Sequence, residues 1–160
     1  MVVSTEQKTR MNAAQQAKQP KPRRRILVVD DNLDNVRSLA MLFDTMGHHV
    51  DYAINATVAV DLARRFQPDI VFLDLLLPDD HGAGVCKELR ALPELKQTRI
   101  IAVTASSRML DHQLALDAGC DDVLRKPVSP ETYERLVAGG MYRRKLREFI
   151  AEQLAGKAVK

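Results

Sequence analysis

The feature that most constrains the fold is an unbroken apolar run, Ile70-Val71-Phe72-Leu73, that ends in a carboxylate, Asp74. Such a run, with β-branched residues at its start, favours a strand covered on both faces, as in the middle of a parallel sheet. Three leucines follow, and Pro78 stops any regular continuation. Because open α/β sheets place their chemistry at the carboxyl ends of strands, Asp74 is either a functional carboxylate or a solvated strand end.

The rest of the chain alternates between strand and helix patterns. Further strands are predicted at 26–29, 49–53, 99–104 and 122–125, and helices at 32–46, 57–66, 84–92, 109–118 and from Ser129 onward. Gly47 stands where a glycine ends a helix, and Ser129-Pro130-Glu131 is a typical helix start. Five alternations with short connections predict an α/β fold, a doubly wound parallel sheet of five strands with right-handed crossovers.

Distinctive side chains stand at the ends of four of these strands. They are Asp30-Asp31, Asp74, Thr104 and Lys126. In a doubly wound sheet these ends open on one edge and can converge on one pocket. Three carboxylates repel one another unless a cation such as Mg²⁺, which prefers oxygen ligands, neutralises them. A carboxylate nucleophile beside a metal, an ammonium and a hydroxyl suits phosphoryl transfer.

At this point the sequence resembles the receiver domain of two-component response regulators. The matching segments are Val28–Asn32, Phe72–Pro78, His81-Gly82, Val103–Ala105, Ala118-Gly119 and Lys126-Pro127. The resemblance implies a flavodoxin-like sheet with strand order 2-1-3-4-5. It also implies that Asp74 accepts a phosphoryl group from a sensor histidine kinase or a histidine phosphotransfer protein.

The resemblance further implies a role for each site residue. Asp31, Asp74 and the backbone carbonyl of Leu76 would bind Mg²⁺, with Asp30 acting through water. Thr104 and Lys126 would contact the phosphoryl group, and the Lys126–Pro127 bond would be cis. On this interpretation the protein is not an enzyme beyond its own phosphorylation and slow autodephosphorylation.

Two positions give this chain a character of its own within that pattern. The family usually has Tyr or Phe three residues before its lysine, where this chain has Val123. We therefore expect Thr104 and residues 105–109 to carry the conformational signal. Leu76 and Ser106 stand where family members flank the water that hydrolyses the phosphoryl group, and a leucine there predicts slow dephosphorylation.

The two ends of the chain differ in charge from its middle. Residues 1–25 hold seven Lys or Arg and one Glu, a balance of +6, and residues 142–160 hold six and two, a balance of +4. The body, residues 26–141, holds eleven basic and eighteen acidic residues, a balance of −7. We expect a disordered basic arm at 1–22, a receiver domain at 23–139 and a basic amphipathic helical extension at 140–160 that is able to mediate a homodimer.

Other functions are weaker alternatives. The basic ends also suit a nucleic-acid-binding module, but residues 142–160 are too few for a DNA-binding domain, so direct DNA binding is not expected. A hydrolase of the aspartyl-phosphate kind needs a second acid where Leu76 stands. No apolar run is long enough to span a membrane, so a cytoplasmic location is expected. Cys86 and Cys120 match no metal spacing and are expected as buried or free thiols.

Overall fold

Five parallel strands form one sheet in the order β2-β1-β3-β4-β5 in the computed structural model, which describes residues 21–139. They are β1 (Arg25–Val29), β2 (His49–Ala53), β3 (Ile70–Leu73), β4 (Arg99–Thr104) and β5 (Asp122–Arg125). The predicted fold class and strand order are confirmed. The predicted helical extension at 140–160 lies outside the described residues, as does all but the end of the predicted arm at 1–22.

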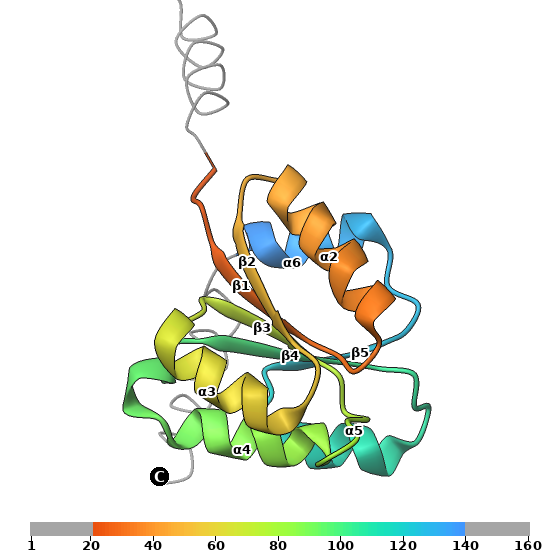
Figure 1. Cartoon of the computed structure of the whole chain (residues 1–160). Coiled ribbons are helices and arrows are strands. Elements are labelled where there is room, and N and C mark those ends of the chain that lie inside the picture. Colours follow the sequence, from red (N-terminus) through yellow and green to blue (C-terminus); the bar gives the residue numbers. More distant parts are fainter. Residues whose placement is uncertain (1–20, 140–160) are drawn as a thin grey trace, which may run out of the picture.

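The helices cover both faces of the sheet (Figure 1). One face carries α2 (Leu33–Thr45) and α6 (Pro130–Ala138), and the other carries α3 (Ala56–Phe66), α4 (Gly82–Ala91) and α5 (Met109–Asp117). A short 3₁₀ turn, η1 (Pro93–Leu95), follows α4. Each helix begins within a few residues of its predicted start, and α2, α3, α4 and α5 also end within a few residues of their predicted ends.

Side-chain caps explain where several of these helices begin. Asn32 accepts hydrogen bonds from the first turn of α2, Asn55 caps α3 and Ser129 caps α6. These caps satisfy backbone N–H groups that have no partner inside the helix. Gly47 follows α2 with a φ of +87°, which a residue with a side chain rarely adopts, so the predicted helix end is confirmed.

The central strands are buried on both faces because alternate residues point to opposite sides. Leu27 and Val29 pack with α3, α4 and α5, whereas Ile26 and Val28 pack with α2 and α6. The second cluster contains an aromatic group in which Phe43 stacks on Phe72 at 5.2 Å, with Tyr133 edge-on to both rings. The continuous apolar pattern in the sequence is therefore the consequence of two separate cores on one sheet.

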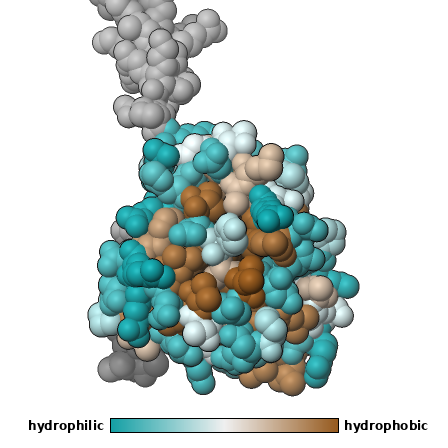
Figure 2. Space-filling view, in the orientation of Figure 1, coloured by the Kyte–Doolittle hydropathy of each residue, from teal (hydrophilic) through white to brown (hydrophobic). Residues whose placement is uncertain are grey.

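The surface between α2 and α3, where the edge strand β2 is uncovered, shows apolar residues among the hydrophilic ones (Figure 2). Exposed side chains of these segments are Met41, Tyr52, Ile54 and Val58. Among residues 21–139 there is no helix of the length and apolar character that crossing a bilayer requires. Cys86 and Cys120 are free and buried, as expected.

Candidate functional site

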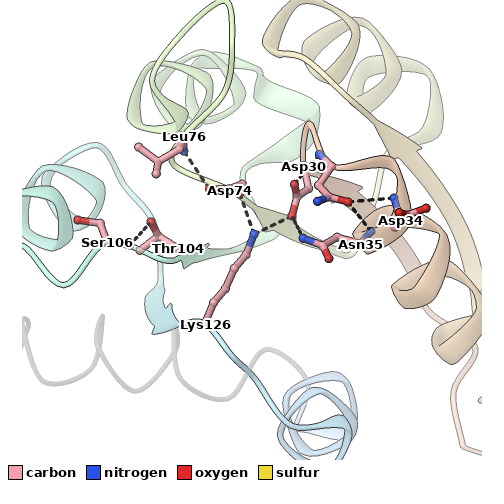
Figure 3. Close-up of polar contacts among 9 residues, drawn as sticks. Asp30, Asp34, Asn35, Asp74, Leu76, Thr104, Ser106 and Lys126 are labelled. Atoms are coloured by element: carbon pink, nitrogen blue, oxygen red, sulfur yellow. Dashed lines mark hydrogen bonds and ion pairs between the residues drawn. The ribbon is translucent and has the colours of Figure 1, made fainter.

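The distinctive strand ends meet at the carboxyl edge of the sheet (Figure 3). Asp30 and Asp31 follow β1, Asp74 follows β3, Thr104 ends β4 and Lys126 follows β5. Since these four strands are parallel neighbours, their ends open on the same side. Asp30 and Asp74 are buried, Thr104 is fully buried and Asp31 is exposed.

Lys126 joins the two buried acids. Its Nζ lies 2.8 Å from Oδ2 of Asp30 and 2.8 Å from Oδ2 of Asp74. Burial works to lower the pKa of the Lys126 ammonium, but its hydrogen bonds to Asp30 and Asp74 and their negative charges outweigh burial and raise that pKa above its ordinary value. Lys126 is therefore a fixed positive charge. The bond between Lys126 and Pro127 is cis, as the family resemblance implied.

The acids of this edge form what we call the acid cluster: Asp30, Asp31 and Asp74. One carboxylate oxygen of each lies within 4.8 Å of those of the others. Three carboxylates and the single ammonium of Lys126 leave an excess of two negative charges at this edge. Clustered carboxylate oxygens are the donors that a hard divalent cation prefers, so these residues fit Mg²⁺.

Local backbone geometry orients the two buried carboxylates. The N–H of Asn32 donates to Oδ1 of Asp30 over 2.9 Å, and the N–H of Leu76 donates to Oδ1 of Asp74 over 2.9 Å. In both cases the donor lies two residues after the acid, which is an Asx-type turn. Each acid therefore keeps its Oδ2 for Lys126 because a turn holds its Oδ1.

Thr104 connects the site to the first turn of α5. Its Oγ1 accepts a hydrogen bond from the N–H of Ser106 over 3.1 Å. The Ser106 hydroxyl donates in turn to the carboxylate of Asp111, and the Ser106 carbonyl oxygen lies 3.0 Å from Nε2 of His112. The hydrogen bonds of Ser106 thus link the buried hydroxyl of Thr104 to α5.

Two hydrogen bonds hold the loop between β3 and α4 in place. Oδ1 of Asp79 accepts from the N–H of Ala56 over 2.8 Å at the start of α3, and this backbone hydrogen bond lowers the pKa of Asp79. The second closes the loop on itself, because Gly82 donates its N–H to the carbonyl of Leu75 over 2.9 Å. A Cβ on Gly82 would lie 2.4 Å from the carbonyl oxygen of Asp74, so α4 begins directly against the backbone of the site.

Sequence reasoning missed several contacts around the site. Asn35, in the first turn of α2, donates from Nδ2 to Oδ2 of Asp30 over 3.3 Å. His81 caps α4 by accepting the N–H of Ala83 on Nδ1. The only sequence signal for these roles is position: both residues stand within a turn of a predicted helix start, where polar side chains find free N–H groups or nearby acids.

The comparison with protein families decides the identity of this arrangement. The model of the response regulator receiver domain matches residues 26–138. The chain belongs to this family. A receiver domain accepts a phosphoryl group in two-component signalling and binds Mg²⁺ at an acidic pocket, and the acid cluster has the composition of such a pocket.

Similar proteins carry receiver domains in different contexts. The chain is 32% identical over 112 residues to the signal transduction histidine-protein kinase BarA of Shigella flexneri, covering 70% of this chain but only 12% of that kinase. It is 33% identical over 104 residues to the polar-differentiation response regulator DivK of Brucella anthropi, covering 65% of this chain and 85% of DivK. Kinases and response regulators thus share this domain.

Solved structures agree with the fold. The chemotaxis response regulator CheY4 of Vibrio cholerae aligns with a TM-score of 0.68 at 23% identity, covering 72% of this chain and 97% of CheY4. The receiver domain of the sensor histidine kinase PA1611 from Pseudomonas aeruginosa aligns with a TM-score of 0.69 at 28% identity, covering 75% and 98%. That receiver domain was crystallised with a magnesium ion coordinated in its active site cleft.

Proposed function

We propose that Asp74 is the residue that accepts the phosphoryl group, in a Mg²⁺-dependent reaction with a phosphohistidine donor. The observation that supports this most directly is the position of Lys126, whose ammonium lies 2.8 Å from one oxygen of Asp74. Asp74 is also a member of the acid cluster and follows the middle strand of the sheet. A carboxylate that lies beside a fixed cation and a cation site can act as a nucleophile toward phosphorus.

The reaction is a simple displacement. An oxygen of Asp74 attacks the phosphorus, a P–O bond forms, and the P–N bond of the donor histidine breaks. The electron pair returns to the imidazole nitrogen, which takes a proton from water. After the transfer, the Lys126 ammonium donates to a phosphoryl oxygen instead of to the Asp74 carboxylate. The hydroxyl of Thr104 donates to a second phosphoryl oxygen.

The ligands that we propose for Mg²⁺ are Asp31 and Asp74, the backbone carbonyl of Leu76 and, through water, Asp30. When bound, the ion offsets the negative charge that gathers on the phosphoryl oxygens. Its +2 charge equals the excess negative charge of the acid cluster with Lys126. The relative PA1611 supports this choice of metal, since its receiver domain holds magnesium.

Phosphorylation by acetyl phosphate tests the assignment without the need for a cognate kinase. Incubation with Mg²⁺ should add the mass of one phosphoryl group to the intact protein. Asp74→Asn should abolish the addition, because an amide cannot form the acyl phosphate. Asp34→Asn is the matched control, since Asp34 is an exposed acid at the same edge in the first turn of α2. Full labelling of the Asp74→Asn protein would refute the assignment.

The partners that we propose are a sensor histidine kinase or a histidine phosphotransfer protein as donor, and a second copy of the chain through residues 140–160. The kinase relative BarA supports the first of these. The second rests on the apolar stripe Phe149, Ile150 and Leu154 within a basic segment. Sedimentation of the full chain and of a truncation after Gly140 tests it. The full chain should have the apparent mass of a dimer and the truncation that of a monomer. A full chain that is monomeric with and without phosphate would refute it.

The relatives differ in output, so the expectation that this chain does not bind DNA directly stays a prediction from the sequence. The DNA-binding response regulator MtrA of Mycobacterium leprae is 36% identical over 109 residues, which are 47% of its length. Phosphotransfer profiling would identify the donor of this chain, and salt-dependent DNA binding that persists in Asp74→Asn would favour the nucleic-acid alternative.

A further inference from the structure

A neutral side-chain amide contacts the acid cluster from the first turn of α2. Nδ2 of Asn35 donates to Oδ2 of Asp30, and the N–H of Asn35 donates to Oδ1 of Asn32 over 3.1 Å (Figure 3). The cap of the helix therefore fixes the residue that carries the amide. We propose that Asn35 is a positioning residue for the magnesium site, which holds the Asp30 carboxylate in the orientation that the ion needs. This inference rests on the proposed function.

Three donors determine how the Asp30 carboxylate is oriented. Oδ1 accepts the backbone N–H of Asn32, and Oδ2 accepts both Lys126 at 2.8 Å and Asn35 at 3.3 Å. The ammonium is the strongest of the three because it is charged and close. It is also the donor that must leave, since Lys126 is shared with Asp74 and follows the phosphoryl group. After transfer, Asn35 is the donor that remains on Oδ2.

The chemical type of this donor is also significant. A second cation on Asp30 would cancel part of the negative charge that attracts Mg²⁺, whereas an amide adds no net charge. With Asn35 in place, the acid cluster and Lys126 keep their excess of two negative charges. An amide therefore orients the carboxylate without weakening the field that binds the ion.

The position of Asn35 makes the substitution a clean test. Asn35 is exposed and lines a hollow of about 420 Å³ between α2 and the loop that leads to α6, together with Asp30, Ser38 and Lys126. A change at an exposed position leaves both cores intact. Asn35→Leu removes the donor at similar volume, and Asn35→Gln keeps an amide on a longer side chain.

Magnesium binding itself is the first measurement, by titration calorimetry or by NMR of the amides of Asp30 and Asp31. Asn35→Leu should raise the Kd for Mg²⁺ about tenfold, the lower end of the range for outer-shell partners of a metal site, because Asp30 contacts the ion through water. Asn35→Gln should recover part of the loss. Ser38→Ala, one turn further along α2 on the same hollow, is the matched control and should bind Mg²⁺ like the wild type.

Unfolding by urea separates positioning from ordinary stabilisation. The gain in unfolding free energy from Mg²⁺, at concentrations well above both Kd values, should shrink by about 1.4 kcal/mol for a tenfold loss in affinity. A purely structural bond would instead lower the stability equally with and without Mg²⁺. That result, with an unchanged Kd, would overturn the inference.

A double substitution tests whether Asn35 acts through Asp30. In an Asp30→Asn background, Asn35→Leu should change the Kd by less than about twofold, because the carboxylate that it orients is gone. A full tenfold effect in that background would overturn the inference. If the wild type binds Mg²⁺ and accepts phosphate but Asn35→Leu matches it, only this inference fails. If the wild type binds no Mg²⁺, the proposed magnesium site fails as well.

Discussion

Ion pairs of opposite character lie at the amino edge of the sheet, where the parallel strands begin, and at its carboxyl edge, where they end. At the amino edge, Arg90 donates to Oδ2 of Asp121 over 2.6 Å and to the carbonyl oxygens of Thr98 and Gly119, while Asp121 also accepts the N–H of Ile100. One cation meets one anion there, and backbone groups occupy the remaining bonds. At the carboxyl edge, one cation meets three anions.

This difference shows how a matched pair and an unmatched cluster serve different purposes. A buried pair with its hydrogen bonds satisfied joins segments that are distant in sequence, and nothing further can bind without breaking it. A cluster with excess charge is complete only when a ligand arrives. We therefore expect substitutions at the amino edge to change stability and substitutions at the carboxyl edge to change chemistry.

The largest effect should follow the loss of the amino-edge pair. Arg90→Leu leaves the Asp121 carboxylate, whose side chain is only 10% exposed, without its cation. Removing one partner of such a buried pair costs about 3–5 kcal/mol of unfolding free energy, measurable by urea titration. Arg37→Leu, at an exposed position on α2, should cost less than about 0.5 kcal/mol. A loss below about 1 kcal/mol for Arg90→Leu would remove the contrast between the edges.

Loss of the carboxyl-edge cation should instead slow phosphorylation. Lys126→Ala should reduce the rate of phosphorylation by acetyl phosphate on the order of 100-fold, because a donor to the transferred group is lost. The same change should tighten Mg²⁺ binding, since the acids lose their internal cation. Arg125→Ala, an exposed neighbouring cation, serves as the control. Weaker Mg²⁺ binding in Lys126→Ala would contradict the view that lysine and metal neutralise the same charges.

A smaller effect is expected at Leu76, a residue that is 52% exposed beside the site. A leucine cannot hydrogen-bond a water that attacks the phosphorus, and the Ser106 hydroxyl already donates to Asp111. Leu76→Asn should therefore speed the loss of phosphate a few-fold after the donor is removed. Its Mg²⁺ affinity should barely change, because we expect residue 76 to bind through its carbonyl. An unchanged or slower decay would show that this side chain does not control the water.

The smallest effect concerns His48, at the amino edge. Burial lowers the pKa of this histidine from its ordinary 6.5, and the charges of Arg24, Arg23 and Lys21 lower it further. Its neutral Nδ1 accepts the N–H of Arg24 over 3.1 Å. Because the pKa in the folded state is the lower one, the contribution of His48 is complete above pH 6.5 and is lost as pH falls through the folded value.

The unfolding free energy of the wild type should therefore fall between pH 7.5 and 5. His48→Gln, which keeps an acceptor that does not titrate, should show a weaker dependence over this range. Asp79 does not interfere, because its pKa lies below its ordinary 3.8 and its hydrogen bond from Ala56 is weakened only in stronger acid. Equal slopes in the two proteins would contradict the role of His48.

The parts of the molecule that the sequence predicts well are those with a local signal. The run from Ile70 to Leu73 predicts a buried strand because every residue is apolar. Gly47 predicts a helix end because glycine readily adopts the positive φ that is found there. Asp74, Thr104 and Lys126 could be placed together because parallel strand ends share one edge. Topology thus turns a local pattern into a three-dimensional prediction.

The contacts that the sequence could not predict are long-range pairings of single side chains. Arg90 and Asp121 are 31 positions apart, and Asp79 meets Ala56 across 23. No periodicity records such pairs, because each depends on how a helix packs beside a loop that is distant in the sequence. Asn35 was missed for a different reason: its donor role depends on a side-chain orientation within one turn of Asp30 that the residue type alone does not specify.

The absent side chain of Gly82 has a mechanical consequence. Since no atom separates the start of α4 from the Asp74 carbonyl, the helix and the end of β3 touch backbone to backbone. Side chains absorb small displacements by changing rotamer, but two peptide groups in contact have no such freedom. Between the Asp74 peptide and the first residue of α4 there is therefore no side chain whose rotamers could absorb a displacement, so the position of the helix is set directly by the backbone of the site.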